Sequence, residues 1–165
     1  MSKVLIIGDS CKDVFIYGEI DRLTPEAPVP VFNPIRETSN DGMAKNVANN
    51  VEALNVEIFT ITNPNSIKKV RYVDKKSNQL VLRVDEHDYC ERIDQNLLTT
   101  IMGNKAQVWG SEGTKFDAII ISDYCKGFLN EDDIQFICEE YDNVFIDTKK
   151  QLGSWISHAN FIKIN

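Results

Sequence analysis

The sequence lacks long apolar runs and clustered basic residues. No apolar run approaches the length of a membrane span, and the N-terminus has no basic region followed by an apolar stretch and a cleavage site. These absences predict a cytoplasmic protein with no membrane partner. The net charge is -7, and the lysines at 68–69, 75–76 and 149–150 form pairs rather than a patch. Because a phosphate backbone needs a clustered basic surface, the sequence predicts no nucleic-acid partner.

Cysteine and histidine are also sparse. The four cysteines are Cys11, Cys90, Cys125 and Cys138. They form no Cys-x-x-Cys pair and have no histidine at zinc spacing, so free thiols in a reducing compartment are expected. His87 and His158 lie far apart in polar contexts, and nothing resembles a nucleophile elbow. We interpret both histidines as surface residues.

The 165 residues alternate between short apolar runs and amphipathic stretches, as in an α/β domain. Val4–Ile7, closed by Gly8, is an unbroken apolar run typical of a strand buried on both faces. Further strands are predicted at 56–61, 117–123, 144–147 and 161–164. Helices are predicted at 42–54, 93–102 and 131–141, the first from the apolar stripe Ala44, Val47, Ala48, Val51 and Leu54.

Two extended segments interrupt this alternation. The stretch from Asp21 to Phe32 contains Pro25, Pro28 and Pro30, which forbid a helix and fit an extended edge segment or a flap. Residues 70–73 and 80–85 flank a polar loop and predict an antiparallel hairpin. The sequence therefore predicts an α/β sheet with an inserted β flap.

Acidic residues recur where the predicted strands end. Asp9 and Asp123 each close a buried strand, and Lys126 and Lys149 follow two of the strand ends. Ligands of open α/β sheets bind beyond the carboxyl ends of the strands, so these residues predict a site for a sugar or a phosphorylated ligand. Asp13 follows four residues after Asp9; the alternative is that Asp9 caps a turn and Asp13 faces solvent.

The first predicted helix offers a second polar group to that site. Asn40 or Asp41 can cap its N-terminus, where free backbone N–H groups can meet an anion or a sugar hydroxyl. Asn46, in the first turn, can reach toward a ligand at the strand ends. The alternative is that Asn46 belongs to a solvated polar face.

Several segments, taken together in chain order, carry a family resemblance. They are Ile7–Asp9 with Asp13, Arg22–Pro30, Gly42–Ala48, Asn78–Asp85, Ser122–Gly127 and Ile146–Lys149. These segments resemble the ribokinase-like (PfkB) carbohydrate kinases, and among them the heptose-7-phosphate kinase domain of the bifunctional ADP-heptose synthesis proteins. The flap and the Ser-Asp-Tyr-x-Lys-Gly segment are specific to that domain. The resemblance spans nearly all of the chain.

The resemblance implies a partial ribokinase-like three-layer sandwich, with ATP and Mg²⁺ as cofactors and a sugar or sugar phosphate as substrate. Asp13, Gly42 and Asn46 match positions that hold sugar hydroxyls, and Arg83 is a candidate contact for the sugar phosphate. The floor of the cleft is implied to contain Asp123, Lys126 and Lys149, and Asp9 is a further candidate substrate contact. The resemblance also implies that residues of about 14–40 and 70–85 form a small inserted β lid, which in the family often makes a dimer contact and so implies a homodimer.

Departures from the family pattern shape the functional hypotheses. Asp41 stands where a glycine usually precedes Gly42, and the connection 62–67 is shorter than its counterpart. The chain ends at Asn165, the match to the first residue of a magnesium-binding Asn-x-x-Glu motif. A Gly-Ala-Gly-Asp segment, which in the family stabilises the phosphate charge and deprotonates the sugar, is absent.

The sequence therefore predicts residues 1–165 to be a single ribokinase-like domain truncated at its C-terminus. This domain keeps the sugar-binding half and the lid and is inactive alone, with no catalytic residue assigned. Two alternatives stay open: one half of a split kinase completed by a separate chain, and a non-catalytic dimerisation module. A phosphoacceptor receiver domain ranks last, because it has no flap and normally shows paired acids after the first strand.

Overall fold

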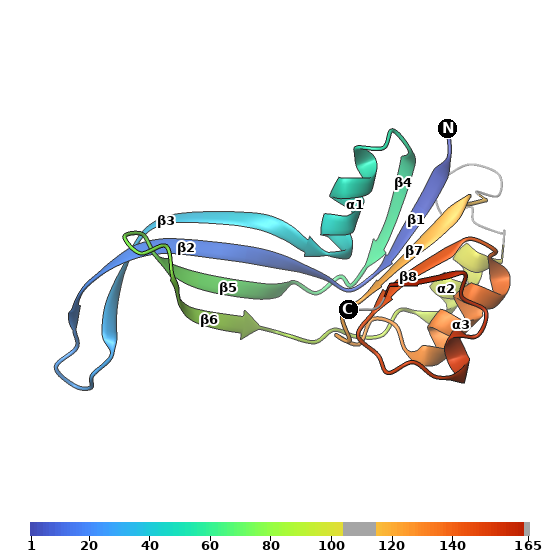
Figure 1. Ribbon diagram of the computed structural model, residues 1–165. Helices are drawn as coiled ribbons and strands as arrows, with labels where there is room; N and C mark the ends of the chain where they lie inside the picture. Colours follow the sequence, from blue (N-terminus) through green and yellow to red (C-terminus); the bar gives the residue numbers. More distant parts are fainter. Residues whose placement is uncertain (104–114, 164–165) are drawn as a thin grey trace.

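A five-stranded parallel sheet forms the body of the molecule (Figure 1). The computed structural model describes residues 1–103 and 115–163. The strand order is β4 (Glu57–Thr62), β1 (Lys3–Gly8), β7 (Ala118–Asp123), β8 (Val144–Thr148) and β9 (Phe161–Lys163). Every neighbouring pair is parallel, so the carboxyl ends of these strands share one edge. All five strands predicted from the apolar runs are confirmed.

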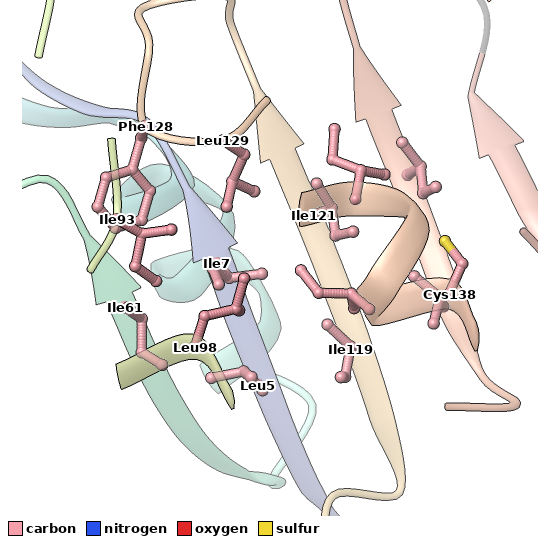
Figure 2. Close-up of a cluster of buried hydrophobic side chains, with 14 of the residues drawn as sticks. Leu5, Ile7, Ile61, Ile93, Leu98, Ile119, Ile121, Phe128, Leu129 and Cys138 are labelled. Atoms are coloured by element: carbon pink, nitrogen blue, oxygen red, sulfur yellow. The ribbon is translucent and has the colours of Figure 1, made fainter. Parts of the chain in front are cut away.

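Helices cover the two faces of this sheet, giving the expected three layers. On one face lie α2 (Gln95–Met102), α3 (Glu131–Glu140) and the 3₁₀ helix η2 (Ser154–Ile156). On the other face lies α1 (Ala44–Glu52). Alternate residues of β1 point to opposite faces, so Leu5 and Ile7 belong to one apolar core and Val4 and Ile6 to the other. Figure 2 shows the first and larger core.

A second, four-stranded sheet projects from the carboxyl edge of the first (Figure 1). Its order is β3 (Pro30–Met43), β2 (Ser10–Leu23), β5 (Ile67–Asp74) and β6 (Leu80–Glu86). The central pair β2 and β5 is parallel, and both outer pairs are antiparallel. Pro30 and Pro34 lie in β3, an edge strand, where proline removes no essential ladder hydrogen bond.

The switch between the two sheets takes place at Gly8 and Asp9. The strand β1 ends at Gly8 and β2 begins at Ser10. Gly8 has a φ of 152°, and a Cβ at this position would collide with the carbonyl oxygen of Ser122. Only glycine allows β1 to approach β7 this closely while the chain turns into the second sheet.

The N-terminus of α1 differs from the sequence prediction. The helix begins at Ala44 after Met43, which has a φ of 56°, and no side chain caps it. Asn40 and Asp41 do not cap the helix, because both lie within β3 and the Asp41 carboxylate pairs with Lys12 at 3.2 Å. The prediction of an Asn40 or Asp41 cap was therefore wrong. Leu54, placed on the apolar stripe, is 70% exposed because the helix ends at Glu52.

The four cysteines are free thiols, three of them buried. Burial is the main cause that raises the pKa of Cys11 to about 11, of Cys90 to about 12 and of Cys138 to about 11. These thiols are therefore protonated and weakly nucleophilic at neutral pH. None of the helices in the described ranges is both long and apolar enough to cross a membrane.

Candidate functional site

A cavity of about 520 Å³ lies where the second sheet meets the carboxyl edge of the first. Strands β2, β3, β5 and β6, helix α1 and the segments after β7 and β8 all contribute to it. Its lining consists of Cys11, Asp13, Phe15, Asn40, Asp41, Gly42, Met43, Asn46, Lys69, Arg71, Arg83, Tyr124 and Lys149. The volume falls in the range of small-molecule sites.

Strand register explains why polar side chains gather on the cavity face of the second sheet. Asp13 pairs with Asn40 on one side and with Lys69 on the other. One step along β2, Phe15 pairs with Arg71, which in turn pairs with Arg83. Residues paired directly across strands share a face, so these two rows face the cavity together.

Asp13 is held firmly at the base of this face. Its Oδ1 accepts a hydrogen bond from Arg71 Nη1 at 2.5 Å, and its side chain is 24% exposed. Gly42 on β3 pairs with Cys11 and lies diagonal to Asp13: a Cβ there would collide with Asp13 Oδ2 and stand 2.6 Å from Cys11 Sγ. The absence of a side chain at Gly42 therefore makes room for the Asp13 carboxylate.

The cavity has a surplus of positive charge although the whole chain is acidic. Its lining holds four cations, Lys69, Arg71, Arg83 and Lys149, against the carboxylates Asp13 and Asp41. Asp41 is neutralised by Lys12 and Arg83 by Asp85, both from outside the lining, and Asp13 pairs with Arg71. The surplus therefore consists of Lys69 and Lys149. The Lys149 ammonium lies 4.6 Å from the centre of the Tyr124 ring. Such a surplus favours an anionic ligand.

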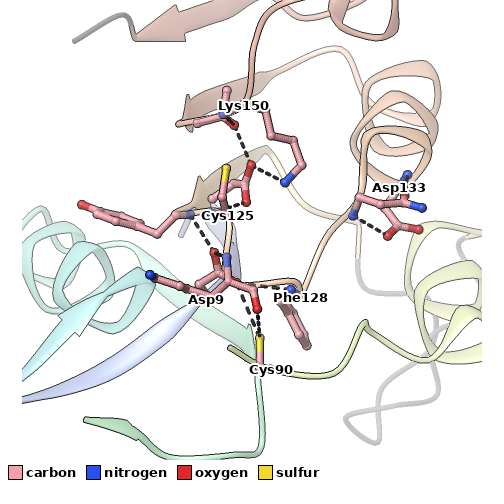
Figure 3. Close-up of polar contacts among 11 residues, drawn as sticks. Asp9, Cys90, Cys125, Phe128, Asp133 and Lys150 are labelled. Carbon is pink, nitrogen blue, oxygen red and sulfur yellow. Dashed lines mark hydrogen bonds and ion pairs between the residues drawn. The ribbon is translucent and has the colours of Figure 1, made fainter. Parts of the chain in front are cut away.

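Asp9 is a buried structural centre and does not line the cavity. It is 1% exposed, and its oxygens accept hydrogen bonds from the backbone N–H groups of Tyr124 at 2.7 Å, Lys126 at 3.1 Å and Phe128 at 3.3 Å. Cys90 Sγ lies 3.7 Å from the same carboxylate (Figure 3). Asp9 therefore fixes the loop after β7, the loop that carries Tyr124 into the cavity.

Asp123 and Lys126 are likewise engaged in internal contacts. Asp123 is 1% exposed and accepts from Thr148 Oγ1 at 2.6 Å and from Lys150 Nζ at 2.7 Å (Figure 3). Lys126 Nζ donates to Asp88 at 2.6 Å. These ion pairs tie the segments after β6, β7 and β8 together at the carboxyl edge.

The structure thus divides the residues singled out from the sequence into two groups. Those that line the cavity are Asp13, Gly42, Asn46, Arg83 and Lys149. Those that support it from behind are Asp9, Asp123 and Lys126. Sequence reasoning missed Lys69 and Arg71 in the lining. The only available signal was their alternate spacing in β5, which places both on one face.

No cluster of metal-ligating side chains accompanies the cavity. Within residues 1–103 and 115–163, no three His, Cys, Asp or Glu side chains lie close enough to hold a metal ion. Asn165, the predicted magnesium contact, lies outside the described residues. The Mg²⁺ and ATP sites implied by the resemblance therefore stay predictions.

Curated proteins similar to this chain include bifunctional HldE proteins, and no family model matches the chain. The bifunctional protein HldE of Helicobacter pylori strain J99 is 30% identical over an alignment of 196 positions, which covers 100% of this chain and 41% of that protein. HldE of Hyphomonas neptunium is 32% identical over 78% of this chain and 31% of that protein. The chain thus spans less than half the length of these relatives.

Solved structures give a likeness in fold. Phosphofructokinase-2 from Escherichia coli in complex with fructose-6-phosphate superimposes with a TM-score of 0.52 and 10% sequence identity. The match covers 96% of this chain and 57% of that chain. At this identity the likeness concerns the fold alone, and it includes the second sheet as well as the body.

Proposed function

The chain is a homologue of the bifunctional HldE proteins with the ribokinase-like fold of carbohydrate kinases, and from this premise we propose that its cavity binds a sugar phosphate. The observation that carries the proposal is the composition of the lining. One cavity combines a fixed carboxylate and two asparagines, which suit sugar hydroxyls, with four cations, which suit a phosphate. Arg71 and Arg83 already pair with Asp13 and Asp85, but among the described residues an uncharged sugar would leave Lys69 and Lys149 without an anionic partner.

We assign the hydroxyl contacts to Asp13, Asn40 and Asn46. The free lone pairs of Asp13 accept from hydroxyls, and Gly42 keeps β3 clear of that carboxylate. Arg83 faces the phosphate from β6, and Lys149 lies on the opposite side of the cavity, above Tyr124. Asp9, Asp123 and Lys126 act indirectly by fixing the segments that carry Tyr124 and Lys149.

The proposed role is that of the sugar-binding half and lid of a carbohydrate kinase. Phosphoryl transfer depends on positioning and on electrostatic stabilisation of the moving phosphate. We propose that the groups that bind ATP and Mg²⁺ come from sequence other than these 165 residues, either in continuation of the chain or in a separate chain. The second sheet serves as the lid, and the cytoplasmic location stays a prediction.

Calorimetric titration of the purified chain with heptose 7-phosphate and other sugar phosphates, and then with Mg-ATP, tests the proposal. We expect saturable binding of a sugar phosphate in the absence of ATP. If neither ligand binds, the sugar-phosphate proposal fails. Turnover by the chain alone would contradict the view that the nucleotide half lies elsewhere.

A second candidate role, dimerisation through the lid, is favoured by the face of the second sheet that points away from the cavity. Alternation along the strands places the row Ile16, Tyr72 and Leu82 on that face, with Phe32 packed edge-on against Tyr72 at 5.4 Å. Leu82 is 54% exposed and Val84, on the same face, is 37% exposed. We propose that a second copy of the chain covers this row.

The variant Leu82→Lys tests the lid contact. We expect the unmodified chain to sediment as a dimer at micromolar concentration and the variant to shift to monomer, because a lysine at the centre of an apolar contact opposes burial. Leu54→Lys is the matched control, since Leu54 is 70% exposed and lies in the body at the end of α1. A monomeric unmodified chain, or equal dissociation by both substitutions, would refute the lid dimer.

A further inference from the structure

Lys69 is a mostly buried residue of the second sheet. It lies on the central strand β5, lines the cavity and is 9% exposed. Among the described residues, no carboxylate and no hydrogen-bond acceptor contacts its ammonium. By contrast, four other lysines of the second sheet and its loop form ion pairs: Lys12 with Asp41, Lys68 with Glu86, Lys75 with Glu19 and Lys76 with Asp21. An ammonium that lines a cavity with no acid bonded to it is available to an anionic ligand.

Two carboxylates flank Lys69 in strand register, and arginines hold both of them. Asp13 on β2 accepts from Arg71 at 2.5 Å. Asp85 on β6 accepts two hydrogen bonds from Arg83, at 2.6 and 2.8 Å. Each arginine thus takes the acid that Lys69 would otherwise pair with. The ammonium is left facing the cavity.

The charge of Lys69 nevertheless acts on its surroundings. The pKa of Asp85 is lowered, chiefly by the hydrogen bonds from Arg83, and Lys69 adds to that effect. The pKa of Cys11 is raised to about 11, chiefly by burial and by Asp13, while Lys69 and Arg71 oppose the rise. Strand register places Lys69 in one row with Asp13 and Asn40, two of the proposed hydroxyl contacts.

We propose that Lys69 is the main contact for the phosphate group of the bound sugar phosphate. This inference rests on the proposed function and assigns its specificity to a residue that the sequence did not single out. An ammonium has three N–H donors, and the oxygens of a phosphate monoester dianion can accept hydrogen bonds from them. Arg71 and Arg83 pair with each other in strand register on the same face, so N–H groups that their aspartates leave unused can share the anion.

The assignment implies that Lys69 raises the affinity for a sugar phosphate but does not stabilise the fold of the ligand-free protein. The side chain of Lys69→Met is unbranched, one atom shorter than lysine and neutral, so the substitution removes the unpaired charge. We expect the ligand-free variant to melt at the same temperature as the unmodified chain or higher, because methionine suits a buried position. Loss of a lysine with a structural role would lower the melting temperature instead.

Binding of two probes measures the ligand role directly. The probes are heptose 7-phosphate and the same heptose without its phosphate, titrated calorimetrically into each variant. Lys69→Met should weaken binding of the phosphorylated probe by about 10- to 100-fold and leave the unphosphorylated probe unchanged. Lys68→Met is the matched control, because Lys68 is the preceding residue of β5, faces the other side and pairs with Glu86 at 3.9 Å.

The outcomes separate this inference from the proposed function. If the unmodified chain binds neither probe, the proposed function fails and the inference with it. If the unmodified chain binds the phosphorylated probe and Lys69→Met binds it equally well, the function stands and the role of Lys69 is refuted. A selective loss of Mg-ATP binding in Lys69→Met would assign the residue to the nucleotide and also refute the inference, as would a lowered melting temperature.

Discussion

Replacing Asp13 by asparagine is expected to weaken sugar-phosphate binding by about 100-fold, the loss typical of one member of a charged, hydrogen-bonded set. The substitution keeps the shape of the side chain but removes the charge that accepts from sugar hydroxyls. It also leaves the Arg71 guanidinium, 23% exposed, without its carboxylate. Calorimetric titration with heptose 7-phosphate measures the loss.

Asp41→Asn is the matched control for this experiment. Asp41 lines the same cavity, but its side chain is 38% exposed and pairs with Lys12 at 3.2 Å. An exposed pair of this kind contributes little, so we expect a change in affinity of less than about threefold. Equal losses in both variants would mean that the charge of the cavity matters rather than the position of Asp13. Undiminished binding by Asp13→Asn would remove Asp13 from the proposed site.

The body of the fold is readable from the sequence because its signals are local. The run Val4–Ile7 predicts a buried strand, and β1 occupies Lys3–Gly8 between β4 and β7. The helix signals at 93–102 and 131–141 correspond to α2 and α3. The resemblance to carbohydrate kinases is confirmed by the HldE relatives, and it added the expected bounds of the lid, about 14–40 and 70–85, which periodicity alone did not provide.

The site was less readable because its geometry depends on contacts between distant residues. Asp9 and Asp13 look equivalent in the sequence, as two acids at the end of one strand. The chain passes from the first sheet to the second between them. Asp9 is therefore buried against the loop after β7, whose backbone donors lie 115 to 119 residues further along the sequence, whereas Asp13 stays on the cavity face. No local pattern specifies which of the two carboxylates becomes buried.

The lysine pairs illustrate the same limit. Lys68 and Lys69 read as one surface pair, yet alternation along β5 separates them, and the parallel pairing of β5 with β2 places Lys69 beside Asp13. Lys149 and Lys150 also diverge: Lys149 lies above Tyr124, whereas Lys150 pairs with buried Asp123 at 2.7 Å. Which lysine of a pair faces the ligand follows from tertiary register and not from composition.

Asp9→Asn is expected to lower the free energy of unfolding by about 3 kcal/mol, since hydrogen bonds to charged groups contribute about 1.5–3 kcal/mol each. Three backbone N–H groups converge on the Asp9 carboxylate, which is 1% exposed. Asparagine offers one acceptor oxygen, and its NH₂ group would face one or more of these donors. A buried backbone donor then loses its partner, with no access to water.

Urea unfolding of the purified variants measures this loss, with Asp117→Asn as the control. Asp117 also accepts a long-range backbone hydrogen bond, from Lys3 N at 2.7 Å, but it is exposed and water can replace the bond. We expect its substitution to cost about 1 kcal/mol or less. If both variants lose a similar free energy of unfolding, Asp9 contributes no more to stability than an exposed hydrogen-bond acceptor. Asp9 fixes the loop that carries Tyr124 beneath Lys149. We therefore expect Asp9→Asn to weaken sugar-phosphate binding as well, in the protein that remains folded. Such a result would show that the hydrogen bonds to this buried carboxylate determine both the stability of the protein and the shape of the cavity.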